Sequence, residues 1–92
     1  MRDIMLEKEI EKALIKRVKE LGGMCEKFAS PGRRSVPDRI ITLFDNTIIF
    51  VELKAPGKYP TESQELDHAR RRLYGCDVRV ISTLEGARAF EK

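Results

Sequence analysis

The sequence predicts an α/β protein of the α+β type, with one mixed β-sheet and elements in the order α-β-β-β-α-β-α. Short runs rich in Ile, Val and Phe lie between turn residues, as strands do, and amphipathic segments of helical period precede, separate and follow them. The helical segment between the last two strands favours a right-handed βαβ crossover, which makes those strands parallel. The length of 92 residues suits one core, so we expect a single domain over residues 1–92.

The first helix is predicted over residues 4–21, ending at Gly22-Gly23. Glu7 falls inside its apolar stripe and Glu11 lies at the stripe's edge. The stripe itself consists of Leu6, Ile10, Leu14, Val18 and Leu21. Glu7 is either a partly exposed residue of the first turn or a carboxylate that reaches a functional site. A strand over residues 24–29 and a loop over residues 30–36 follow.

A hairpin comes next, with strands predicted over residues 39–44 and 47–54 around the turn residues Asp45-Asn46. Asp38 precedes Asp45 by seven residues, and Glu52 follows Asn46 by six, so the two carboxylates are expected almost opposite each other. The two-residue period of a strand places Glu52 and Lys54 on one face. The apolar run 48–51 predicts a strand that is buried on both faces.

The C-terminal part of the chain is predicted to add a helix, a strand and a short helix. Thr61-x-x-Gln64 resembles a capping box for a helix that ends near Tyr74. We expect Leu66, Ala69 and Leu73 to face the core and His68 to be exposed. A strand over residues 77–82 follows, and Ser82-x-x-Glu85 is expected to cap a last helix through Phe90.

Two acids and a lysine that converge beside an apolar strand are costly to bury unless they pair or hold an ion. An isolated E-x-K is most often an ion pair at a strand end, and Pro-Asp alone is a common turn, but their combination is specific. Pro37-Asp38 with Glu52-Leu53-Lys54 resembles the PD-(D/E)xK nuclease signature. The strings 27–32 (KFASPG), 36–39 (VPDR) and 51–58 (VELKAPGK) resemble its VRR-NUC branch, in particular the short stand-alone form of phages and bacteria. Ser35 stands where many relatives carry Gly.

This resemblance covers nearly the whole chain and implies a restriction-endonuclease-like core with a Mg²⁺ or Mn²⁺ cofactor. Two acids and a backbone carbonyl are sufficient protein ligands for Mg²⁺, which keeps several waters. The implied ligands are Asp38 and Glu52, the carbonyl of Leu53 and, through water, an acid of the first helix, for which Glu7 is the first candidate and Glu11 the reserve. Lys54 would orient or deprotonate the attacking water or stabilise charge on the phosphate. Gln64 either lies at the active site or serves only as a cap.

The predicted function is a metal-dependent, structure-specific DNA endonuclease that resolves four-way (Holliday) junctions as a homodimer. The alternatives are a monomeric nuclease that nicks flaps or branches, a DNA-binding module without catalysis, and a structural subunit. The net charge of +3 is compatible with DNA. We expect DNA contacts from Lys27, Arg33, Arg34, Arg39 and Lys58, although Arg33 and Arg34 could equally form a solvated loop. No organic cofactor, membrane contact or disulfide is expected, and a cytoplasmic location follows from the two reduced cysteines.

Overall fold

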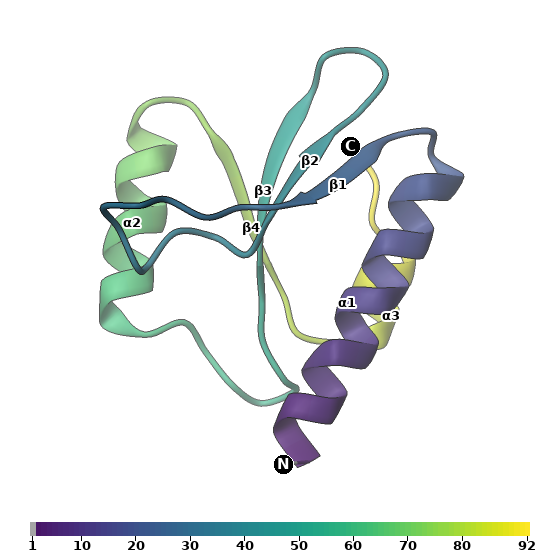
Figure 1. The fold of residues 1–92 in the computed structure, drawn as a ribbon, viewed down its shortest axis with the longest axis horizontal. Helices are drawn as coiled ribbons and strands as arrows, with labels where there is room; N and C mark the ends of the chain where they lie inside the picture. The colour runs from purple at the N-terminus through teal and green to yellow at the C-terminus, as the bar shows by residue number, and fades with distance from the viewer. Residues whose placement is uncertain (1) are drawn as a thin grey trace.

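The computed structural model describes residues 2–92 and confirms the predicted order of elements (Figure 1). The helices and strands differ from the predicted ranges by no more than a few residues at their ends. They are α1 (Arg2–Glu20), β1 (Met24–Lys27), β2 (Arg39–Thr42), β3 (Ile48–Leu53), α2 (Glu62–Leu73), β4 (Asp77–Ile81) and α3 (Leu84–Arg88). In this part of the chain no helix combines the length and the hydrophobicity that crossing a membrane requires.

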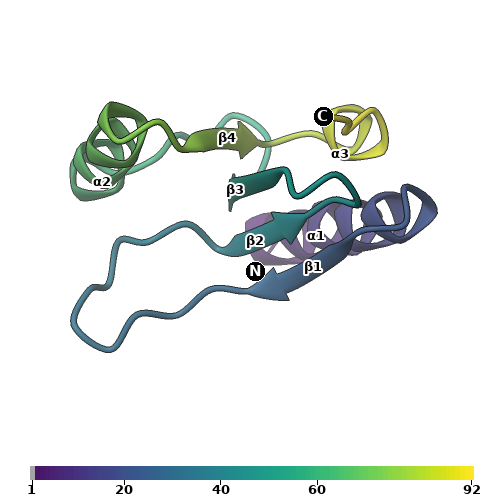
Figure 2. The same cartoon turned by 90° about the horizontal axis from the view of Figure 1, so that it is seen from above.

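The four strands form one mixed sheet in the order β1-β2-β3-β4. The pairs β1–β2 and β2–β3 are antiparallel, and β3–β4 is parallel, as the crossover through α2 predicted. Helices α1 and α3 cover one face of the sheet, and α2 lies on the opposite side (Figures 1 and 2). The loop between β1 and β2 extends from the sheet on the side of α2 (Figure 2).

The core lies between the sheet and the α1–α3 layer. Ile10, Leu14 and Val18 are the buried residues of α1, which confirms the predicted stripe. The two ends of the stripe, Leu6 and Leu21, are half-buried. The three buried residues pack with buried side chains of the sheet and of the C-terminal segment, including Ile41, Ile49, Val51, Leu53, Ile81, Ala87 and Phe90. Helix α1 ends where Gly22 adopts a φ of 76°, a left-handed conformation that glycine reaches without strain. This packing fixes α1 under the strands that carry the two acids.

The predicted packing of α2 is wrong. Leu66 and Leu73 are 66% and 82% exposed, and Ala69 is exposed as well. The buried residues of this helix are Asp67 and His68, so a polar side of α2 faces the sheet. Apolar spacing identified the helix correctly, but it did not identify which side the sheet would cover.

A cation held by an acid explains how α2 packs through polar residues. Arg71 donates to the buried Asp67 carboxylate at 2.7 Å. Its guanidinium lies 5.0 Å from the ring centre of Phe28 and 5.2 Å from that of Phe50. A cation is attracted to the face of an aromatic ring. These contacts and the ion pair therefore stabilise the Arg71 charge on the side of α2 that faces the sheet.

Two smaller predictions are also corrected. Ile48 is 52% exposed, so β3 is not buried on both faces along its whole length. Helix α3 is capped by Thr83 rather than by Ser82, because the Thr83 hydroxyl accepts a hydrogen bond from the amide of Gly86 at 2.9 Å. The capping box of α2 is confirmed, with Thr61 and Gln64 bonded reciprocally.

Candidate active site

The two central acids lie where the hairpin opens. Arg39 pairs with Val51 in the β2–β3 register, so the preceding Asp38 lies opposite the following Glu52, as counting from the turn predicted. The Asp38 carboxylate accepts a hydrogen bond from the Leu53 amide at 2.7 Å. This bond fixes Asp38 at the end of the ladder, beside the strand that carries Glu52.

The carboxyl groups of Asp38 and Glu52 interact directly. Glu52 is only 1% exposed. Burial raises its pKa to about 8, and a hydrogen bond with Asp38 and the negative charge of Asp38 add to the shift, while the Lys54 cation opposes it. Beside Asp38, and with so little water around it, the Glu52 carboxyl group holds a proton more tightly than an ordinary glutamate does while no cation is near. A divalent cation between them would replace that proton.

The structure distinguishes the two acids of α1. Both line a cleft of about 480 Å³ together with Asp38 and Leu53. Burial and then the nearby Asp38 charge raise the pKa of Glu7, and Lys54 acts in the opposite direction, which places Glu7 in the field of the central acids. The Glu11 carboxylate instead accepts from Arg39 Nε at 2.9 Å. Glu7 is therefore the better placed of the two to act with Asp38.

The structure contradicts the prediction that Arg39 contacts DNA. The residue is 8% exposed, and its side chain lies on the α1 side of the sheet. Besides the bond to Glu11, its guanidinium donates to the carbonyl of Cys25 at 3.3 Å. Because strand residues alternate between faces, a residue adjacent to Asp38 points to the opposite side. Arg39 is therefore a buried structural cation that links α1 to β1 and β2 on the side of the sheet opposite Asp38.

The other predicted basic residues divide into two groups. Lys27, Arg33 and Arg34 line the same cleft as Asp38 and Glu7. Lys58 lies outside this lining, and its ammonium is 3.4 Å from the carboxylate of Asp3 at the start of α1. The cleft is thus lined by both acids and cations, and cations of this kind are suited to contact phosphate oxygens.

The Gln64 side chain both caps α2 and contacts an acid of the site. Its amide oxygen accepts from the Thr61 backbone at 2.9 Å, and its amide nitrogen donates to Glu52 Oε2 at 3.3 Å. An amide has one acceptor and two donor hydrogens, so a single side chain caps α2 and reaches the acid. The two interpretations of Gln64 were therefore not exclusive.

The predicted exposure of His68 is wrong, and the sequence analysis missed its position. His68 is 2% exposed, and its Nε2 lies 3.4 Å from Glu52 Oε1. Burial, and then the charge of Arg72, lowers the pKa of the imidazole. The signal that could have revealed this position is the four-residue spacing from Gln64, which places both side chains on one side of the helix.

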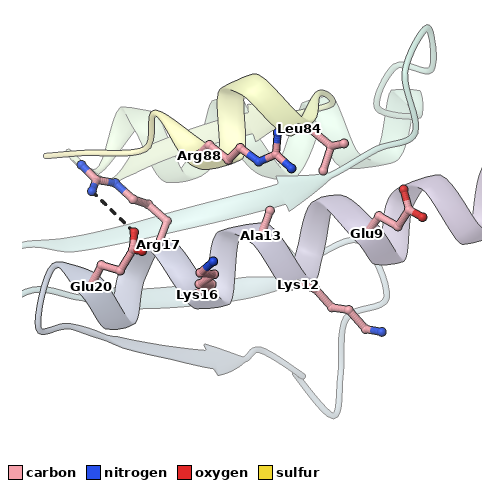
Figure 3. Close-up of a pocket in the computed structure, with 8 residues that line it drawn as sticks. All are labelled: Glu9, Lys12, Ala13, Lys16, Arg17, Glu20, Leu84 and Arg88. Atoms are coloured by element: carbon pink, nitrogen blue, oxygen red, sulfur yellow. Dashed lines mark ion pairs between the residues drawn. The ribbon is translucent and has the colours of Figure 1, made fainter.

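A second hollow, of about 530 Å³, lies between α1 and α3 (Figure 3). It is lined by cations such as Lys16 and Arg88, and an ion pair of 3.8 Å joins Arg17 and Glu20. Its acids, Glu9 and Glu20, lie at opposite ends, as Figure 3 shows. Without a pair of facing carboxylates, this hollow lacks the chemistry that distinguishes the cleft at Asp38.

The comparisons with known proteins agree with this geometry. No protein-family model matches the chain. "Putative nuclease p44" of Acyrthosiphon pisum secondary endosymbiont phage 1 is 48% identical over 80 residues, which span 87% of this chain and 86% of the phage protein. A solved structure described as a VRR_NUC domain matches with a TM-score of 0.84 and 30% identity over 88% of both chains. The chain belongs to the VRR-NUC family.

The donor set of this VRR-NUC site fits Mg²⁺ or Mn²⁺. Both ions prefer hard oxygen ligands, and Mg²⁺ retains water, so the Asp38 and Glu52 carboxylates provide suitable first ligands. Among residues 2–92, no three side chains of Asp, Glu, His or Cys form a group that could hold a metal by themselves. The site would therefore be completed by backbone oxygen, water or the substrate.

Proposed function

We propose that this VRR-NUC protein is a DNA endonuclease that uses Mg²⁺ or Mn²⁺. The observation that carries the proposal is the buried Glu52 carboxyl group beside Asp38, which itself lines a cleft with the cations Lys27, Arg33 and Arg34. Asp38 and Glu52 would hold the metal, with the Leu53 carbonyl as a further oxygen ligand. The ion would supply Lewis acidity and lower the pKa of an attacking water.

Other side chains around the two acids would supply positioning and charge. The Lys54 cation lies close enough to Glu52 and Glu7 to oppose the rise in their pKa values. It could therefore orient or deprotonate the water, or stabilise charge on the phosphate. Glu7 would hold a water at the metal. Arg33 and Arg34 would anchor phosphates of the bound strand, because guanidinium groups remain charged and bind phosphate oxygens in pairs.

The direct test of the proposal is nicking of a supercoiled plasmid with Mg²⁺, Mn²⁺ or chelator. The wild-type protein should nick only with metal, and Asp38→Asn should lose cleavage while keeping DNA binding, because the variant removes negative charge near phosphate. Asp77→Asn is the matched control, since Asp77 lies on the surface and pairs with Arg79. An Asp38→Asn protein that cuts at the wild-type rate refutes the site. A wild-type protein that binds DNA but never cuts it supports the alternative of a binding module.

We further propose that branched DNA, and the four-way junction in particular, is the substrate. Within residues 2–92, each chain has a single Asp38–Glu52 site, whereas resolution of a junction requires two symmetric cuts, which a two-fold dimer provides. A panel of four-way junctions, flaps and linear duplexes is the appropriate assay. Paired cuts across the junction would agree with the proposal. Cuts confined to flaps would replace it with a monomeric flap nuclease.

The exposed side of α2 supports self-association. Leu66, Leu73 and Tyr74 are 66%, 82% and 82% exposed, and Leu66 and Leu73 lie on one side of the helix with Ala69 between them. Apolar side chains grouped in this way mark contact surfaces. Helix α2 has acidic residues in its first turn and arginines in its last, so an antiparallel pair of α2 helices would oppose unlike charges. We therefore expect a second copy of this chain to cover this surface.

Light scattering at micromolar concentration tests the dimer. The wild-type protein should have twice the mass of the chain, and Leu73→Glu should be a folded monomer because it places charges at the two-fold contact. Leu73→Glu should lose paired cutting of four-way junctions but retain single nicks in plasmid, since the cleft is complete within one chain. A monomeric wild-type protein would refute this assembly and leave the nuclease proposal standing.

A further inference from the structure

Helix α2 approaches both oxygens of Glu52. Gln64 donates to Oε2 at 3.3 Å, and His68 Nε2 lies 3.4 Å from Oε1. The two side chains are one helical turn apart, so they converge on one carboxyl group from the same side of α2. Lys54 and Asp38, which adjoin the ends of β3 and β2, act on the same carboxyl group through their charges.

The His68–Glu52 contact joins two buried polar atoms for which no other hydrogen-bond partner is found among residues 2–92. Within residues 2–92, Glu52 Oε1 and His68 Nε2 are the buried side-chain atoms that lack a hydrogen bond of good geometry, and they face each other. A buried polar atom without a partner costs about 1–3 kcal/mol. An imidazole in its Nε2–H tautomer donates one hydrogen bond, and Oε1 accepts one. A small rotation of either side chain would complete the bond.

We propose that His68 is a positioning residue that, together with Gln64, orients the Glu52 carboxyl group for metal binding. The inference rests on the proposed function, because it takes Glu52 as a metal ligand. A carboxylate held at both oxygens keeps one orientation, and so presents its remaining lone pairs to Asp38's side of the cleft. Residues that orient a ligand in this way typically contribute about 10- to 100-fold in metal affinity.

The competing explanation is that His68 only fills space between α2 and the sheet. Two substitutions at this position separate the explanations. His68→Leu puts an apolar side chain of similar size in place of the imidazole and removes the donor. His68→Gln keeps an N–H donor at a similar distance from the backbone, so it should rescue whatever depends on the hydrogen bond. Both proteins are compared with the wild type by thermal unfolding before any other measurement.

The decisive measurement is Mn²⁺ binding by calorimetry without DNA, followed by the Mg²⁺ concentration that gives half-maximal nicking. We expect His68→Leu to bind Mn²⁺ about 10- to 100-fold more weakly, and to need correspondingly more Mg²⁺. His68→Gln should remain within a few-fold of the wild type. Nicking by His68→Leu at saturating Mg²⁺ should recover substantially, because a positioning residue does not touch the reacting atoms.

Each outcome decides a different statement. Equal Mn²⁺ affinity of His68→Leu and the wild type overturns the role of His68 and leaves the nuclease proposal intact. Equal losses of affinity in His68→Leu and His68→Gln also overturn it, since packing alone would then explain them. If Mn²⁺ binding is weakened in His68→Leu but not in His68→Gln, and the wild-type protein cuts no DNA, the role of His68 stands and the nuclease proposal is refuted. A wild-type protein that binds no Mn²⁺ overturns both.

Discussion

Replacing Glu52 by Gln should make the metal-free protein more stable at neutral pH. The wild-type carboxyl group is buried, and its pKa is raised from 4.5 to about 8 by burial and by Asp38. An acid whose pKa is raised in the folded state binds a proton more tightly there than in the unfolded chain. The raised pKa of Glu52 therefore does not affect the free energy of unfolding below pH 4.5, where the group is protonated in both states. It lowers the free energy of unfolding as the pH rises from 4.5 toward 8. Gln is neutral and of similar shape, so it removes this loss.

The size of the effect follows from linkage. Between the two pKa values, one proton of difference changes the free energy of unfolding by about 1.4 kcal/mol per pH unit. From pH 5 to pH 7 the wild-type protein should therefore lose roughly 2–3 kcal/mol more than Glu52→Gln. For a domain of this size that corresponds to a relative change in the unfolding temperature on the order of 10 °C.

Thermal and urea unfolding with chelator, at half-unit steps from pH 4.5 to 8.5, measure this difference. Adding Mg²⁺ should stabilise the wild-type protein increasingly as pH rises, because the metal competes with the proton for Glu52. The same addition should leave Glu52→Gln almost unchanged. Parallel pH profiles for the two proteins would refute the reasoning, since they would mean that Glu52 is ionised in the folded protein without a cation.

Three further predictions concern the rest of the cleft. Lys54→Ala should lower the nicking rate by about 100-fold or more, while the Mn²⁺ affinity measured by calorimetry changes little. A large loss of Mn²⁺ affinity would mean that Lys54 acts on metal binding rather than on the water or the phosphate. Glu7→Gln should slow nicking by about 10- to 100-fold. Glu11→Gln should mainly lower the unfolding free energy, by about 1–3 kcal/mol, because it removes the negative charge that faces the buried Arg39 guanidinium. The reverse ranking would transfer the catalytic role to Glu11. Arg33→Ala should weaken DNA binding and reduce its salt slope by about 1, measured by fluorescence anisotropy, and an unchanged slope would remove Arg33 from the interface.

The central acid pair was predictable because its geometry is local. A hairpin with a short turn sets which residues lie opposite each other, so counting outward from Asp45 and Asn46 placed Asp38 against Glu52. The buried stripe of α1 followed from helical periodicity in the same way. The carboxylate of Glu7 inside that stripe was a visible anomaly, and it lies in the cleft.

The structure alone decided what depends on contacts between distant segments. The sequence favoured Glu7 and kept Glu11 as the reserve candidate, and the structural reason to prefer Glu7 came from Arg39, which lies on another element and engages Glu11. The apolar spacing of α2 pointed to the wrong side, because Arg71 covers Phe28 and Phe50 and a polar side therefore faces the sheet. Periodicity specifies that a helix has an apolar side, but the neighbouring elements determine which side is buried. His68 lies against Glu52 for that reason.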